Sequence, residues 1–80
     1  MEAVLFVRMI PLWVTSDELA QLFALYGEVL CARIVTSSLD QESACGIVAM
    51  ANPDEADVAV QQFAGEQHFG VHLAVERLFP

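Results

Sequence analysis

The sequence predicts an α+β fold in which four antiparallel strands form one sheet and two helices cover one of its faces. Two observations indicate this fold. Four short segments rich in Val, Ile, Leu and Phe have the length and composition of strands. Two segments between them combine helix-start signals with apolar residues at helical spacing. With 80 residues, the chain has room for one domain, which we expect to span residues 1–80.

The first elements along the chain are a strand and a helix. Residues 4–9 are apolar, and Pro11 stops the strand that they predict. Thr15 and Glu18 have the spacing of a capping box, in which Thr15 is the N-cap of a helix. We expect this helix to end at Gly27 in a left-handed turn. Its apolar face consists of Leu19, Leu22, Phe23 and Tyr26.

A second pair of strands follows, joined by a polar loop. Residues 29–35 and 44–50 have the pattern of strands, and the segment from Thr36 to Glu42 connects them. Hairpin register places Val35 near Cys45.

The last elements are another helix and a strand. Asn52 and Pro53 are a typical cap and first position of a helix, and acidic residues follow them. We expect Gly65 to end this helix and Gly70 to lead into a strand from Val71 to Glu76. The helix has an apolar face of Ala56, Ala59, Val60 and Phe63.

This order of elements predicts the topology of the sheet. Right-handed crossovers convert strand, helix, strand, strand, helix, strand into a ferredoxin-like βαββαβ sandwich. Both helices then lie on one face of the sheet, and the other face is open. We expect the open face to carry the function.

Two strand segments also resemble the signatures of a known family. Leu5-Phe6-Val7 resembles the hexamer of the RNA-recognition motif, and Gly46-Ile47-Val48 lies where the family has its octamer. Residues 19–29 are similar to the family's first helix and its continuation, and residues 70–75 to its last strand. The resemblance covers residues 4 to 76 and implies binding of single-stranded RNA on the open sheet face.

The sequence departs from the family pattern at the positions that stack on bases. Ser43 and Ala44 stand where the octamer opens with a basic residue and glycine, and Met9 replaces the usual Asn of the hexamer. Cys45 and Ile47 occupy the places of two stacking aromatics, so Phe6 alone remains. A stacked base contributes about 1–3 kcal/mol, so two absent platforms lower the expected affinity about 30- to 10⁴-fold.

Strand alternation predicts which side chains line the open face. We expect Leu5, Val7 and Met9 to point into the core, together with Gly46, Val48 and Met50. The predicted outward set is Val4, Phe6, Arg8, Cys31, Arg33, Val35, Cys45, Ile47, Ala49, His72, Ala74 and Glu76. Within it, the candidate binding residues are Phe6, Arg8, Arg33, Cys45 and Ile47.

The charge of the chain opposes non-specific binding to a polyanion. Eleven acidic residues face three arginines and no lysine, for a net charge of −8. We therefore expect an RNA-binding module whose binding of single-stranded RNA is weak or atypical. The alternative is a protein-interaction module that binds a partner, or a second copy in a homodimer, through the apolar sheet face.

Other functions have little support in the sequence. We expect no enzyme activity, because no nucleophile–base arrangement or glycine-rich phosphate loop is present. His68 and His72 do not share a helical face, so we expect no metal site, and nothing indicates a cofactor. Strand register separates Cys31 from Cys45, which argues against a disulfide. Trp13 is a loop residue that either offers a stacking surface or packs on the domain's edge. Without a secretory signal or membrane span, we expect a cytoplasmic location and no membrane partner.

Overall fold

The computed structural model describes residues 2–35 and 42–78. Within these ranges the element order is the predicted one, βαββαβ. The strands are β1 (Ala3–Ile10), β2 (Val29–Val35), β3 (Ala44–Met50) and β4 (Ala74–Arg77), and the helices are α1 (Ser16–Phe23) and α2 (Pro53–Phe63). Nearly all of the predicted loop after β2, residues 36–41, lies outside the described ranges.

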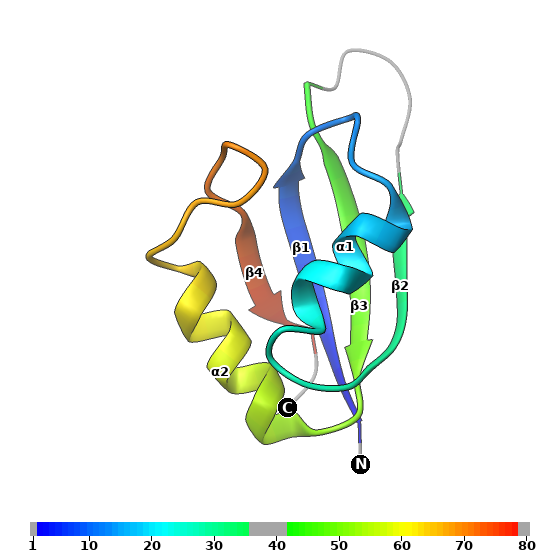
Figure 1. Ribbon diagram of the computed structural model, residues 1–80, viewed down its shortest axis with the longest axis vertical. Coiled ribbons are helices and arrows are strands. Elements are labelled where there is room, and N and C mark those ends of the chain that lie inside the picture. The colour runs from blue at the N-terminus through cyan, green and yellow to red at the C-terminus, as the bar shows by residue number, and fades with distance from the viewer. Residues whose placement is uncertain (1, 36–41, 79–80) are drawn as a thin grey trace.

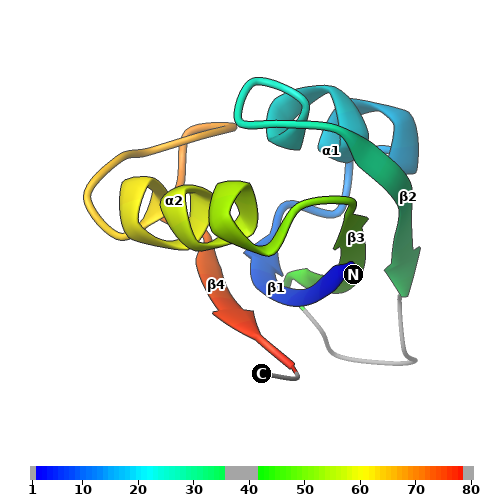
Figure 2. The same cartoon turned by 90° about the horizontal axis from the view of Figure 1, so that it is seen from below.

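The strands form one antiparallel sheet in the order β2-β3-β1-β4. The hairpin register pairs Val35 with Cys45, as predicted. Figure 1 shows the two helices in front of the sheet, and the perpendicular view in Figure 2 shows them in one layer on one side. The predicted α+β sandwich is therefore confirmed, and no helix formed by the described residues covers the other face of the sheet.

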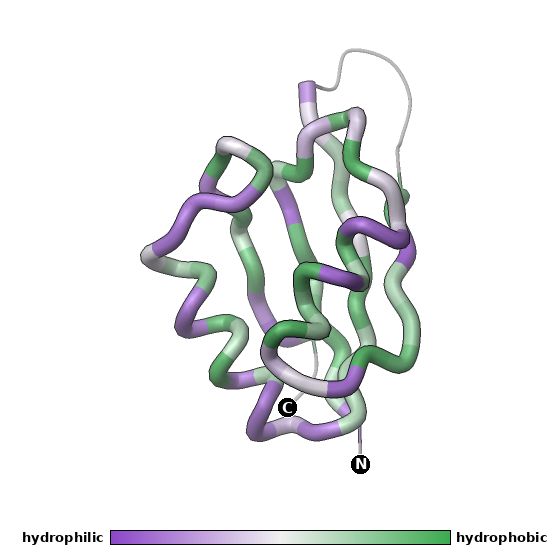
Figure 3. The backbone as a smooth tube through the Cα atoms, viewed as in Figure 1, coloured by the Kyte–Doolittle hydropathy of each residue, from purple (hydrophilic) through white to green (hydrophobic). Residues whose placement is uncertain are grey.

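The hydrophobic core lies between the sheet and the helices. Leu5, Val7, Val48 and Met50 point inward from the central strands and are fully buried. In the hydropathy-coloured tube the strands are mostly hydrophobic, whereas hydrophilic and hydrophobic residues alternate along the helices (Figure 3). The helices contribute Leu19, Phe23, Ala56, Ala59 and Phe63 to the core.

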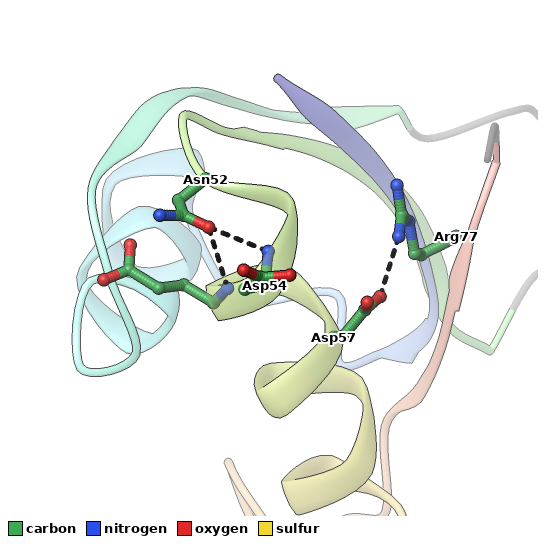
Figure 4. A network of polar contacts seen from close by, with 5 residues as sticks. Asn52, Asp54, Asp57 and Arg77 are labelled. Atoms are coloured by element: carbon green, nitrogen blue, oxygen red, sulfur yellow. Dashed lines mark hydrogen bonds and ion pairs between the residues drawn. The ribbon is translucent and has the colours of Figure 1, made fainter. Parts of the chain in front are cut away.

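Local capping groups define both helix starts. Thr15 and Glu18 form the predicted capping box, because the Glu18 N–H donates to Thr15 Oγ1 at 3.1 Å and the Thr15 N–H donates to Glu18 Oε1 at 2.9 Å. Asn52 Oδ1 accepts from the Asp54 N–H at 2.8 Å (Figure 4). Figure 4 also shows the pair that ties α2 to β4, in which Arg77 Nη1 donates to Asp57 Oδ1 at 2.8 Å.

The end of α1 differs from the prediction. The helix ends at Phe23, and two i→i+3 hydrogen bonds, from Leu25 to Leu22 and from Tyr26 to Phe23, tighten the chain beyond it. Gly27 is therefore not the helix terminator. It is a point of close approach, because a Cβ there would lie 2.9 Å from the Cβ of Glu55. The end of α2 agrees better with the prediction, since Gly65 lies two residues beyond Phe63.

The last strand begins later than predicted, at Ala74 instead of Val71. His68 and Val71 exchange two backbone hydrogen bonds of 2.8 and 3.0 Å and enclose Phe69 and Gly70. The φ angles of these two central residues, 56° and 79°, are those of a type I′ turn. The segment before β4 is thus a tight hairpin turn.

Strand β1 contains an irregularity that alternation does not predict. Val7 pairs with Gly46 and Ile10 with Ala44, so Arg8 and Met9 together lie opposite the single residue Cys45. As a result Ile10 is fully buried, whereas Met9 has a φ of 67° and is 56% exposed. The prediction that Met9 points into the core is therefore wrong.

Candidate nucleic-acid interface

Cross-strand pairing places the outward side chains in rows across the open face. The middle row runs through all four strands, because Arg33 pairs with Ile47, Ile47 with Phe6, and Phe6 with Glu76. Neighbouring strands are about 4.8 Å apart, so this row spans about 14 Å. Three of the five candidate residues, Phe6, Arg33 and Ile47, are therefore neighbours on one face.

A second row contains the other two candidates. Val35 pairs with Cys45, and Arg8 pairs with Ala74 across the other edge of β1. The bulge adds Met9 to this row, which sequence reasoning missed. The structure thus brings all five candidate residues into two adjacent rows.

A third row is mostly apolar. Ala49 pairs with both Cys31 and Val4, and the Leu78 N–H donates to the Val4 carbonyl at 2.9 Å. Ala49 has the predicted outward parity but is only 7% exposed, because its short side chain lies between larger neighbours. Leu78 is exposed and was also missed, although the alternation of Ala74 and Glu76 continues to it.

The arginines of this face are separated from the acidic residues of the two helices. Among the described residues, Arg77 forms an ion pair with Asp57 and the His68 ring lies 3.5 Å from Glu66, and neither contact involves Arg8 or Arg33. Arg8 and Arg33 are both exposed, as the alternation along their strands requires, and Glu76 is the carboxylate in their rows. Five other acidic residues belong to the two helices: Asp17, Glu18, Asp54, Glu55 and Asp57. The open face is consequently less acidic than the net charge indicates.

Phe6 is the one aromatic side chain in these rows. It is half-buried between Ile47 and Glu76, so its ring is supported by neighbours while part of it faces solvent. Ile47 is 37% exposed and offers an apolar contact without a π face. One base can therefore stack on Phe6, whereas a second base at Ile47 finds only aliphatic contact.

The described residues also bear on the other kinds of site that the sequence raises. Cys31 and Cys45 are both free thiols. His72 is exposed but precedes β4 and is therefore outside the sheet. In the described ranges, no group of three or more His, Cys, Asp or Glu side chains is arranged to hold a metal. No helix there is long and apolar enough to cross a membrane.

The described surface has a groove of about 640 Å³, but it lies elsewhere. It runs between α1 and the edge strand β2, and its walls include Asp17, Gln21 and Leu30. None of the five candidate residues lines it. The candidate interface is therefore an open surface instead of a pocket.

Comparison with known proteins assigns the chain to a family. The family model for the RNA recognition motif matches residues 5–73. The chain therefore belongs to the RNA recognition motif family, as its signature strands predicted.

The relatives agree with this assignment. The chain is 36% identical over 80 residues to "RNA-binding protein CP31B, chloroplastic" of Arabidopsis thaliana, covering 99% of this chain and 28% of that protein's length. Its fold is similar to the crystal structure of RNA Binding Protein PG1, with a TM-score of 0.83, 22% identity and coverage of 98% of this chain and 95% of that chain. It is also similar to the RRM3 domain of Mip6, with a TM-score of 0.85, 16% identity and coverage of 95% and 92%. The cytoplasmic location of the present chain stays a prediction.

Proposed function

We propose that this domain is a single-stranded RNA-binding module that uses the open sheet face, with Phe6, Arg8, Arg33, Cys45 and Ile47 as its contact residues. The observation that carries the proposal is the pairing register, which places Phe6 and Arg33 in one row and Arg8 in the adjacent row. Phe6 stacks on one base, and the arginines contact phosphates on either side of it. Family membership supports the same function.

The proposed binding is weak and depends on salt. Two arginines available to phosphates predict a slope of about −1.4 for log affinity against log salt on a single strand. Arg77 does not contribute, because it is paired with Asp57 on the helical side. The stacking sites lost at Cys45 and Ile47 lower the affinity further.

Titration of the ¹⁵N-labelled protein with oligoadenylate and oligouridine at low salt tests the proposal. We expect amide shifts around Phe6, Arg33 and Ile47, and a Phe6→Ala variant that binds about 5- to 150-fold more weakly. Leu25→Ala is a matched control, since Leu25 is 76% exposed on the helical side. Shifts confined to the helices, or equal binding by the Phe6→Ala variant, would refute the sheet as the site.

A second candidate function is protein binding through the same face. Its support is the exposure of four apolar side chains on this face: Met9, Val35, Ile47 and Leu78. Either a partner protein or a second copy of the chain could bury these side chains. Association with a second copy and RNA binding respond oppositely to added salt, which separates the two.

A further inference from the structure

Trp13 is a large exposed aromatic side chain in the turn between β1 and α1. It is the single tryptophan of the chain and is 63% exposed, whereas Phe23 and Phe63 are fully buried. It follows Met9 by four residues, so their Cα atoms are at most about 15 Å apart. A single strand of a few nucleotides that contacts the second row is therefore long enough to reach Trp13.

Two tight turns hold Trp13 in place. The Val14 N–H donates to the Pro11 carbonyl at 3.1 Å, and Val14 is buried, so the turn that carries Trp13 is anchored in the core. The indole ring of Trp13 also contacts the ring of Phe69 in the type I′ turn, with the ring centroids 5.6 Å apart and the ring planes at 90°. In Figure 1 the loops after β1 and before β4 lie at the same end of the sheet.

The geometry of this contact leaves a ring face available. In a perpendicular pair, the edge of one ring meets the face of the other, so Phe69 covers at most one face of the Trp13 indole. The high exposure of Trp13 agrees with an open face. Trp13 is thus positioned by its neighbours without being enclosed by them.

The backbone beside Trp13 supports a functional interpretation of this arrangement. Met9 and Phe69 are the non-glycine residues with positive φ among those described, and both are bulky. Such residues are costly in the left-handed region and persist where surrounding contacts impose them, often at binding sites. No acidic residue occurs between Met9 and Val14.

From these observations we infer that Trp13 is a second base-stacking platform, which binds a nucleotide further along the same RNA strand than the one on Phe6. The inference rests on the proposed RNA-binding function and extends the contact surface beyond the sheet. Stacking on an aromatic ring tolerates any base, so the ligand class is single-stranded RNA without a required sequence at this position. Trp13 thereby replaces part of the stacking that Cys45 and Ile47 cannot supply.

The fluorescence of the single tryptophan provides a direct test. Oligoadenylate is titrated into the protein at low salt while the emission of Trp13 and the anisotropy of fluorescein-labelled oligoadenylate are followed in parallel. We expect quenching with the same midpoint as the anisotropy change. Trp13→Leu should bind about 5- to 150-fold more weakly, and Trp13→Phe should retain most of the affinity because it keeps a ring.

The outcomes separate this inference from the proposed function. Binding that Phe6→Ala weakens, with unchanged Trp13 emission and wild-type affinity of Trp13→Leu, would overturn the inference and leave the sheet function intact. An absence of any anisotropy change would contradict both the inference on Trp13 and the proposed RNA-binding function. Emission that changes with protein concentration alone would assign Trp13 to a contact between copies and also overturn the inference. Thermal melting of Trp13→Leu and Trp13→Phe verifies that both variants are folded.

Discussion

At the scale of single residues, two residues with unusual backbone conformations determine which side chains are exposed near the open face. Met9 stands in the bulge of β1 with a φ of 67°, and Phe69 stands in the type I′ turn with a φ of 56°. Both conformations are disfavoured for residues with a Cβ. Their effect is to bring Met9 to the open face and Phe69 against Trp13, which alternation along the strands would not do.

Replacement of Met9 by glycine tests the strain at the bulge. We expect Met9→Gly to raise the free energy of unfolding by about 0.5–1 kcal/mol, because glycine adopts positive φ without a steric cost. The gain is partial, since glycine also increases the entropy of the unfolded chain. The midpoint of urea unfolding measures it. Met9→Ala keeps the Cβ and should show no such gain; an equal gain there would contradict the explanation.

At the scale of elements, the helices depend on local hydrogen bonds at their starts. Helix α1 has eight residues, which is too short to be stable in isolation. It is held by its capping box and by the burial of Leu19 and Phe23. A hydrogen bond from the Ile34 N–H to Ser16 Oγ, 3.1 Å long, also joins its first residue to the edge strand β2.

Removal of the N-cap hydroxyl should therefore destabilise the domain. We expect Thr15→Ala to lower the free energy of unfolding by about 1 kcal/mol, because the Glu18 N–H loses its acceptor. Thr15→Ser keeps the hydroxyl and serves as the control. Denaturant unfolding of both variants checks this prediction, and equal stability of Thr15→Ala and wild type would show that packing alone holds α1.

The turn after α1 is linked to the segment after α2 by Tyr26. Burial raises the pKa of Tyr26 above its usual value of 10, and the nearby charge and hydrogen bond of Glu66 raise it further. The Tyr26 hydroxyl donates to Glu66 Oε1 at 3.3 Å, so its protonated form is favoured in the folded state.

This raised pKa predicts a loss of stability in alkaline solution. The unfolded chain releases the Tyr26 proton at lower pH than the folded domain does, so the contribution to stability is complete below about pH 10 and disappears as pH rises through the folded pKa. Denaturant unfolding against pH measures the decline. Tyr26→Phe should show a smaller decline above pH 10; an identical profile would contradict the assignment to the single tyrosine.

At the scale of the whole molecule, charge is distributed unevenly between the two layers. The net charge is −8, yet Arg8 and Arg33 lie on the open face, and five acidic residues belong to the helices. At physiological ionic strength, electrostatic interactions beyond about 8 Å are largely screened. An RNA strand on the open face is therefore affected mainly by the nearby arginines. This separation agrees with the proposed contact between the arginines of an acidic chain and the phosphates of RNA.

The response to salt distinguishes RNA binding from self-association. RNA binding should weaken with added salt, whereas association of two chains of charge −8 should strengthen, because screening reduces their repulsion. Burial of the apolar face against protein is favourable by about 25 cal/mol per Å². Sedimentation at low and high salt measures the mass of wild type and Ile47→Lys. A monomer in both salts, without an effect of Ile47→Lys, would contradict self-association.

Local sequence signals determined much of this protein: the order of the elements, the caps at Thr15 and Asn52, the outward parity of β2 and β3, and the family. These features depend on short-range spacing, which the sequence displays directly. The tertiary structure alone decided the exposure of Met9, the late start of β4 and the contact of Trp13 with Phe69. Each depends on how segments distant in sequence pair and pack. The register of strand pairing and the bulge in β1 override the simple alternation of inward and outward side chains.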